Sequence, residues 1–367
     1  MRLNTKQFKD VCNSILAAID NSELSNYSEA LELKTDKNIL YLNVTNREYF
    51  ASAKFELEEE TILHVVINAH TFLKLISAIT TEEIELVEKE NYLLVKANGN
   101  YKFPMIYENG ELLKLPRIEI KNETLDMNIG GDLLNSIINY NGKILNSKQD
   151  TTPIQKLYYL DQEGCVTFTS CACINNFKLE KNVKLLINNK VVKLFKLFKN
   201  SLIHFHLGYD QLNEYLTQTK IKLETPNLVL TAILPSDSLL SQYPVAQLRA
   251  LANKSYPYNV VLEVEKFLDA INRLKLLDKN NDDCTIHCDV DEVTIKVGDN
   301  EEILPTFNGS KINEGEEYSM ILRISHLKSV LENCEEQYIT FNFGANNSTT
   351  LVRGNVISVI PECEVSK

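Results

Sequence analysis

The sequence predicts an α+β fold made of three repeats of about 120 residues, each with two helices and antiparallel sheets. One observation is that three segments each read as a short apolar strand, a polar break and an amphipathic helix, and they begin 120 and 135 residues apart. A second is that another helical pattern, with apolar residues recurring at three and four, precedes each of them. The first set is VVINAHTFLKLISAI (65–79), LLINNKVVKLFKLFK (185–199) and MILRISHLKSVLENC (320–334), and the second covers 5–16, 130–145 and 263–277.

Between and after these helices lie runs of alternating polar and apolar residues broken by turn residues, for example EEIELVEKENYLLVKANGNYKFPMI (82–106). Alternation of this kind is typical of half-buried strands. Proline and polar residues interrupt the periodic patterns near residues 114–124 and 240–256. We therefore expect three domains, at 1–121, 122–247 and 248–367.

Composition limits the class of protein. The chain has 367 residues, of which 44% are hydrophobic, so it can form more than one core. Its N-terminus, MRLNTKQFKDVC, lacks the apolar segment of a signal peptide, and no apolar run approaches the ~20 residues of a membrane span. We expect a cytoplasmic protein without membrane contact, whose eight cysteines are reduced.

The stretch INNKVVKLFKLFKN (187–200) carries a lysine ladder: Lys190, Lys193, Lys196 and Lys199. On an α-helix a step of three residues is about 300°, so the four lysines fan over roughly half the circumference. Val191, Leu194, Phe195 and Phe198 fill the other half. The pattern predicts an amphipathic helix with one cationic face, which is either a solvated surface or a binding surface.

Charge is unevenly divided between the predicted helices and the rest of the chain. The expected helices hold 13 Lys and Arg against 8 Asp and Glu, a net charge of +5 within a chain of net charge −12, when they are taken as 5–19, 68–79, 130–145, 188–200, 263–279 and 325–335. A focused basic surface of this kind favours contact with nucleic-acid phosphates. The acidic remainder argues against a protein coated with nucleic-acid-binding surface.

Metal and enzyme motifs are weak. The stretch Cys284-Thr-Ile-His287-Cys288 lies in an alternating, strand-like run and has no second ligand pair at zinc spacing, and Cys171-Ala-Cys173 is no stronger. The sequence has no phosphate-binding glycine-rich loop and no nucleophile elbow. We expect no catalytic residues, no metal and no cofactor.

Several stretches resemble the bacterial DNA polymerase sliding clamp, the beta subunit of the replicative polymerase. FLDAINRLKLL (267–277) is similar to the first helix of that family's third domain, and NAHTFLK (68–74) to the second helix of its first. AILP (232–235) with QYP (242–244) resembles the connection between domains two and three, and VISVIP (356–361) resembles the final strand. The resemblance runs from end to end of the chain, at low identity.

The resemblance implies that the three domains form half of a ring. In the family two subunits join head to tail, and helices line a central hole through which duplex DNA passes. The ring then tethers a replicative polymerase for processive synthesis. Lysines suit such a surface, because their contacts to phosphate are non-directional and independent of base sequence. The expected DNA-binding residues are Lys190, Lys193, Lys196 and Lys199, with Lys148, Gln149, Arg273 and Lys275.

Two further sites follow from the resemblance. Phe103 and Met105 match positions that pack against the third domain of the other subunit, where Leu276 and Leu277 sit; burial inside their own domains is the alternative. A pocket between domains two and three receives short peptides from polymerases and the clamp loader. Its expected lining is Thr169, Ile174, Val245, Val359, Ile360 and Pro361.

The pocket region departs from the family pattern, since TSCACI (169–174) replaces a Thr-Asp-Gly-His-Arg-Leu-like stretch. Small residues there are compatible with an apolar groove for an extended peptide of altered sequence. A clamp-fold scaffold that binds proteins without encircling DNA is the alternative function, because a fold alone does not fix function. The oligomeric state discriminates between the two.

Overall fold

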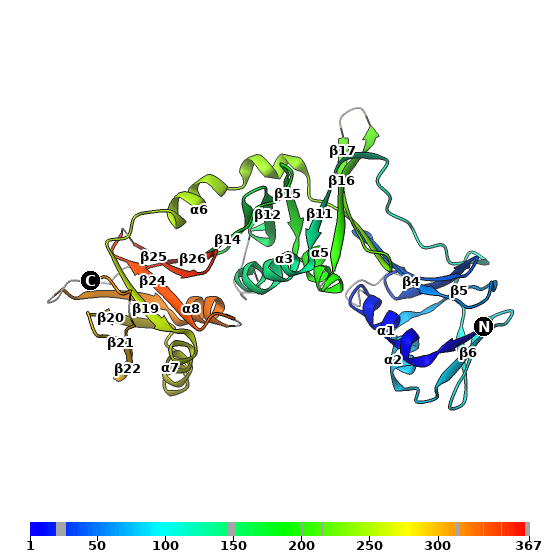
Figure 1. Cartoon of the computed structure of the whole chain (residues 1–367), viewed down its shortest axis with the longest axis horizontal. Coiled ribbons are helices and arrows are strands. Elements are labelled where there is room, and N and C mark those ends of the chain that lie inside the picture. Colours follow the sequence, from blue (N-terminus) through cyan, green and yellow to red (C-terminus); the bar gives the residue numbers. More distant parts are fainter. Residues whose placement is uncertain are drawn as a thin grey trace. The chain divides into compact units, whose positions relative to one another are not determined.

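The computed structural model (Figure 1) describes residues 1–19, 27–145, 152–199, 201–213, 216–307, 309–312, 316–332, 334–345 and 347–363. Contacts between Cα atoms divide the chain into two compact units. The first comprises residues 1–132 and 193–236, and the second 133–192 and 237–367. The predicted division into three domains stays a prediction. The Lys148 and Gln149 positions lie outside the described residues.

The first unit contains an eight-stranded antiparallel sheet and a smaller four-stranded one. The large sheet has the order β11 (Asn122–Gly130), β16 (Leu202–Asn213), β17 (Leu216–Glu224), β18 (Leu228–Ile233), β4 (Tyr49–Glu56), β3 (Ile39–Thr45), β2 (Ala30–Asp36) and β5 (His64–Asn68). The small sheet has the order β1 (Arg2–Asn4), β6 (Glu83–Glu88), β7 (Tyr92–Lys96) and β8 (Asn100–Pro104), and β9 (Tyr107–Glu108) and β10 (Glu111–Leu112) form a hairpin beyond it.

The second unit repeats this combination of a large and a small antiparallel sheet. Its large sheet has the order β15 (Lys184–Asn188), β12 (Leu157–Asp161), β13 (Gly164–Phe168), β14 (Ala172–Asn176), β26 (Val356–Pro361), β25 (Ser348–Arg353), β24 (Tyr338–Phe343) and β19 (Tyr258–Glu263). The small sheet has the order β22 (Asn300–Pro305), β21 (Glu292–Val297), β20 (Asp283–Cys288) and β23 (Tyr318–Arg323).

Helices follow the first and fifth strands of each repeat, as the sequence predicts. They are α1 (Thr5–Leu16), α2 (Ala69–Ala78), α3 (Gly131–Ser136) continued by η1 (Ile137–Asn141) and α4 (Gly142–Leu145), α5 (Asn189–Leu194) continued by η3 (Phe195–Phe198), α7 (Val264–Leu277) and α8 (Ile324–Leu331). Two short helical segments, η4 (Asp237–Gln242) and α6 (Val245–Ala252), follow β18, and η2 (Pro153–Lys156) precedes β12. The α+β repeat is therefore confirmed.

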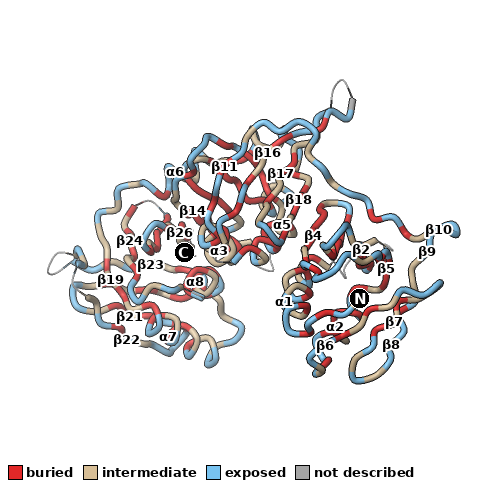
Figure 2. The backbone as a smooth tube through the Cα atoms, turned by 45° about the vertical axis from the view of Figure 1, so that its right-hand side comes forward, coloured by how far each residue is buried: buried red, intermediate tan, exposed pale blue. Residues whose placement is uncertain are grey.

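Local sequence explains where the helices begin and which face they bury. The side chains of Asn4 and Asn68 accept hydrogen bonds from the third following backbone N–H, at 3.1 and 2.9 Å, and so cap α1 and α2. These two helices pack on each other, with Phe8 and Phe72 in edge-to-face contact at 6.4 Å. Helix α7 buries its apolar face and exposes the opposite face (Figure 2).

Successive repeats are joined by one strand-pairing rule: the last strand of a repeat pairs with the strand that closes the first half of the preceding repeat. Each repeat has the order strand, helix, three strands, then again strand, helix, three strands. The last strand of the second repeat, β18, pairs with β4, which closes the first half of the first repeat. Likewise β26, the last strand of the third repeat, pairs with β14, which closes the first half of the second repeat. We call these pairings the first seam (β18 with β4) and the second seam (β26 with β14).

Candidate functional site

The lysine ladder lies on a helix that changes type along its length. Asn188 Oδ1 accepts a hydrogen bond from the Val191 N–H at 2.8 Å, which fixes the start of α5. Val191, Leu194, Phe195 and Phe198 are buried at 0–3% exposure, as their periodicity predicts. The cationic residues Lys193, Lys196 and Lys199 are exposed, and Lys190 is half-buried.

The predicted α-helix does not extend through the last lysine. From Phe195 to Phe198 the chain forms a 3₁₀ helix, which carries Lys196. Lys199 follows this helix with non-helical backbone angles, φ −53° and ψ 134°. Exposed ammonium groups on flexible stems can adjust their positions to a phosphate backbone.

Two of the other predicted DNA-binding residues already have anionic partners. Arg273 donates two hydrogen bonds to the Glu302 carboxylate, at 2.6 and 2.7 Å. This pairing raises the pKa of the Arg273 guanidinium and lowers the pKa of Glu302. Lys275 Nζ donates to the Asn281 carbonyl at 2.8 Å and lies 3.5 Å from Asp282 Oδ1. A phosphate would have to compete with these contacts.

The residues predicted for a subunit contact are placed unequally. Phe103, on β8, is 6% exposed and packs edge to face against Phe72 at 5.4 Å, which fits the alternative of burial in its own domain. Met105 is half-buried. Leu276 and Leu277, at the end of α7, are 69% and 67% exposed, which excludes that alternative for both. Adjacent exposed leucines are typical of a surface that another molecule covers.

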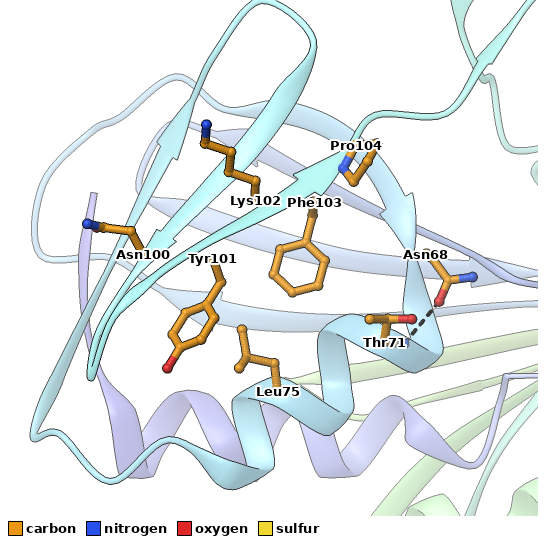
Figure 3. A pocket seen from close by; sticks show the side chains of 8 residues that line it. All are labelled: Asn68, Thr71, Leu75, Asn100, Tyr101, Lys102, Phe103 and Pro104. Atoms are coloured by element: carbon orange, nitrogen blue, oxygen red, sulfur yellow. Dashed lines mark hydrogen bonds between the residues drawn. The ribbon is translucent and has the colours of Figure 1, made fainter.

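A cavity of about 490 Å³ lies beside β8 (Figure 3). Phe103 and Tyr101 point from β8 toward Leu75 and Thr71 of α2, whereas Lys102 points away from them. The remaining lining comes from Asn68, Asn100 and Pro104. An apolar hollow at a sheet edge can accept an apolar side chain from another subunit.

The six residues predicted for a peptide pocket do not all come together. Ile174, Val245 and Val359 belong to one apolar cluster on the large sheet of the second unit, and Thr169 and Pro361 are half-buried. Ile360 is fully buried in the other cluster of this unit, among the residues of α7 and α8. Neighbouring residues of a strand face opposite sides of its sheet, which puts the side chains of Val359 and Ile360 in different clusters. A pocket lined by all six residues stays a prediction.

Tyr243, which follows η4, fixes the segment over this cluster, although no sequence pattern predicted a site role for it. Its hydroxyl donates to the Leu157 carbonyl at 3.1 Å and the Val166 carbonyl at 2.9 Å. Its ring stacks on Tyr159 at 5.4 Å and meets Phe168 edge to face at 5.3 Å. Burial raises the pKa of the Tyr243 hydroxyl well above its ordinary value, so it stays a donor.

The segment formed by η4 and α6, residues 237–252, which we call the second-seam cover, also makes a charged contact near its C-terminal end. Arg249 of α6 donates to both Asp161 oxygens, at 2.7 and 2.8 Å, and to Glu163 Oε2 at 2.8 Å. The hydrogen bonds that Arg249 donates to the Asp161 carboxylate raise the pKa of its guanidinium. Leu239, Leu240, Val245 and Leu248 of η4 and α6 cover the apolar cluster.

The weak metal motif does not assemble. Cys284 and Cys288 are buried on one face of β20, and His287 lies on the other face, with Nδ1 2.6 Å from Ser319 Oγ. Burial raises the pKa of the Cys284 thiol to about 12, which disfavours the thiolate that a metal needs. Within the described residues, no group of three or more His, Cys, Asp and Glu side chains could hold a metal ion. No helix in this part of the chain has the length and apolar content needed to cross a membrane.

Solved structures provide the decisive comparison. No protein-family model matches the chain, and no curated protein sequence matches it significantly. The beta chain of DNA polymerase III from Streptococcus pneumoniae superposes with a TM-score of 0.80 at 16% identity, covering 99% of both chains. The chain has the fold of the bacterial sliding clamps.

Other clamp structures agree. The beta subunit from Borrelia burgdorferi, solved with a natural product, has a TM-score of 0.80 at 15% identity over 100% of this chain and 99% of that one. The sliding clamp from Bacillus subtilis has a TM-score of 0.77 at 14% identity over 99% and 98%. The clamp fold inferred from short sequence stretches is thus confirmed over the whole chain.

Proposed function

We propose that this protein is a DNA sliding clamp: a non-catalytic, ring-shaped homodimer that encircles duplex DNA in the cytoplasm and tethers a replicative polymerase. Short peptides of the polymerase and of clamp-loader subunits would bind the cover of the second seam. The clamp fold supports this proposal, and the strand-pairing rule carries it furthest.

The rule leaves two strands available in each chain. β8 is the last strand of the first repeat, and β22 closes the first half of the third; both lie at the end of their sheet among the described strands. They are the counterparts of the strands that pair at the first and second seams. Pairing β8 of one chain with β22 of another would extend the rule between subunits and satisfy two edges that otherwise invite association. A head-to-tail contact made twice closes a two-subunit ring.

The side chains beside these two edges suit the contact. Phe103, Tyr101 and Leu75 border the hollow beside β8. Leu276 and Leu277 are exposed at the end of α7, which packs against β22. Insertion of the leucines into the hollow of the other subunit would bury apolar surface on both. The expected assembly is a dimer, whereas a clamp-fold scaffold that does not encircle DNA would be a monomer at micromolar concentration by sedimentation.

Topology of DNA binding is the direct test. The protein assembled on nicked circular DNA should remain bound in salt that disrupts phosphate contacts, because escape requires opening of the ring. Cutting the circle should release it, since the ring can then slide off an end. Equal retention on circular and linear DNA would contradict encirclement.

The lysine ladder has its own test. Replacing Lys193, Lys196 and Lys199 with Gln should leave folding nearly unchanged, because glutamine has a similar helix propensity and the three lysines lie off the buried face. Direct DNA affinity should fall, and each lost contact should reduce the log–log salt slope by about 0.9 for duplex DNA, independently of sequence. The matched control replaces Lys34, Lys89 and Lys114 with Gln. A wild-type slope in the ladder variant would show that this face does not contact DNA.

A further inference from the structure

A second cavity, of about 350 Å³, lies at the first seam beneath the segment that follows β10, residues 113–121, which we call the first linker. Phe50 of β4 and Val229 and Thr231 of β18 line it. The linker contributes the other wall through Arg117, Ile118, Glu119 and Ile120. Glu123 and Lys222 complete the lining.

The first linker is anchored on both sides of this cavity. Upstream, Leu113 and Leu115 are buried in a cluster with Ala30 and Val66. Downstream, Lys220 Nζ donates to the Glu119 carbonyl at 2.9 Å, and the Lys121 N–H donates to Asp210 Oδ1 at 3.0 Å. The middle of the linker is therefore held over the sheet instead of collapsing onto it.

Close approach at the downstream end adds to this anchoring. The linker passes so near to β16 that a Cβ at Gly208 would collide with Ile120 and with the Asn122 carbonyl. Lys220 and Asp210 form a buried ion pair at 2.5 Å, with side chains 7% and 8% exposed. A preformed hollow with fixed walls is the usual form of a ligand site.

Arg117, on one wall of the cavity, has only a weak ion-pair contact with a carboxylate. The Arg117 guanidinium lies over the Phe50 ring, with its carbon 5.5 Å from the ring centre. Its Nη2 is 3.5 Å from Glu32 Oε2, longer than a strong charge-assisted hydrogen bond. The Glu32 carboxylate also accepts from Asn43 at 2.8 Å and contacts His64 Nε2 at 3.0 Å. Arg117 thus retains donors for a further carboxylate.

The remaining charges restrict the class of ligand. Lys222 pairs with Glu224, and Glu123, at 52% side-chain exposure, lies 3.2 Å from His206. Glu119, the other carboxylate of the lining, is exposed, so Arg117 is the cation left to meet a ligand carboxylate. Ile118, Ile120 and Val229 provide apolar contact. The arrangement matches an aliphatic side chain next to a carboxylate. At the second seam, the equivalent pairing of strands is covered by side chains of the chain itself.

We propose that the first-seam cavity binds an extended peptide of a partner protein, with an aliphatic side chain among Ile118, Ile120 and Val229 and a neighbouring carboxylate on Arg117. The site is distinct from the second-seam cover assigned above to polymerase peptides. It does not depend on whether the protein encircles DNA, because every residue involved belongs to the first unit.

The test is a titration of the full-length protein, labelled at isoleucine and valine methyl groups, with the capped dipeptide acetyl-Leu-Asp-amide. Saturable shifts should be confined to the methyls of Ile118, Ile120 and Val229. Acetyl-Leu-Asn-amide, which differs only in the carboxylate, should bind about tenfold more weakly, the loss expected for one charge-assisted contact. Equal affinity for the two peptides, or no saturable shift with either, would overturn the proposal.

Variants complete the experiment. Arg117→Gln should abolish the preference for the aspartate peptide while leaving the methyl spectrum dispersed. Lys114→Gln, on the same linker with a side chain 83% exposed, should preserve it. An unchanged preference in Arg117→Gln would overturn the assignment of the carboxylate. Shifts of the same methyls on concentrating the free protein would identify a second copy of the chain as the occupant and equally overturn the proposal.

Discussion

The two segments that cover the seams are held in contrasting ways. Beyond its buried Leu113 and Leu115, the first linker is held by polar contacts: Arg117 to Glu32, and Lys220 with Asp210 to the linker backbone. The η4–α6 segment is held mainly by apolar contacts centred on Tyr243, with Arg249 at its end. Polar and apolar contacts respond differently to pH, salt and side-chain truncation. The stability of the two seams should therefore depend differently on these conditions.

The largest expected loss of stability is at the second-seam cover. Tyr243→Ala removes a buried ring and leaves two carbonyls without their donor, and we expect a loss of about 4 kcal/mol in local stability. Hydrogen exchange of amides in β12 and β13 should report it. Tyr243→Phe is the control: it retains stacking and should cost about 1–2 kcal/mol. A similar loss in both variants would mean that the hydroxyl, not the ring, holds this cover.

The anchoring of the first linker should be nearly as sensitive to substitution at one position. Lys220→Met leaves the buried Asp210 carboxylate without its ion-pair partner, at a cost of about 3 kcal/mol, measured by hydrogen exchange in β16 and β17. The double variant Lys220→Met, Asp210→Leu removes both charges and should recover much of that loss. If the double variant were less stable than Lys220→Met, the pair would be stabilising in itself, and the comparison would need revision.

The first linker and the second-seam cover should lose local stability at different pH values on acidification. Burial alone would raise the pKa of the Asp210 carboxyl, but hydrogen bonds from Lys220 and the Lys121 N–H, with their charges, hold it below its usual range. A carboxyl whose pKa is lowered by folding stabilises the protein above its unfolded pKa of about 4 and loses this contribution as pH falls through the folded value. Below pH 4, exchange should therefore accelerate in β16 and β17 before β12 and β13. Simultaneous acceleration would show that Asp210 is not responsible.

The smallest effect concerns Arg117. Its side chain is 49% exposed, so Arg117→Gln should cost less than about 1 kcal/mol, and the loss should shrink as salt is added. Urea unfolding monitored through hydrogen exchange of β2 and β4 at low and high salt would measure both quantities. A loss that did not depend on salt would indicate that the contact with Phe50 dominates over the one with Glu32.

Sequence periodicity predicted the local structure well because it records which face of an element is buried. Val191, Phe195 and Phe198 are buried as expected, whereas the change to a 3₁₀ helix at Phe195 left no clear mark in the pattern. Strand alternation also places the neighbouring side chains of Val359 and Ile360 on opposite faces of β26, in two different apolar clusters. This separation can be predicted from the sequence alone.

Contacts between distant residues were not predictable in the same way. Arg273 meets Glu302, and Tyr243 meets the carbonyls of Leu157 and Val166, through packing of elements far apart in the sequence. No periodicity encodes such partners. The exposed Leu276 and Leu277 were identified through resemblance to the clamps, since composition alone favours burial of leucine. The fold was therefore more predictable than the partners of individual site residues.

The seams also bear on the protein's synthesis by the ribosome. Ala53 of β4 pairs with Leu228, and Ala172 of β14 pairs with Val359, so each large sheet joins strands separated by most of two repeats. At roughly 5–20 residues per second, β4 would wait on the order of 10–35 s for β18 to emerge. During that interval β4 is paired with β3 on one edge only, and its other edge can pair with a wrong strand. The nascent chain must therefore pass through a period in which its first large sheet is only half built, and chaperone protection matters most there.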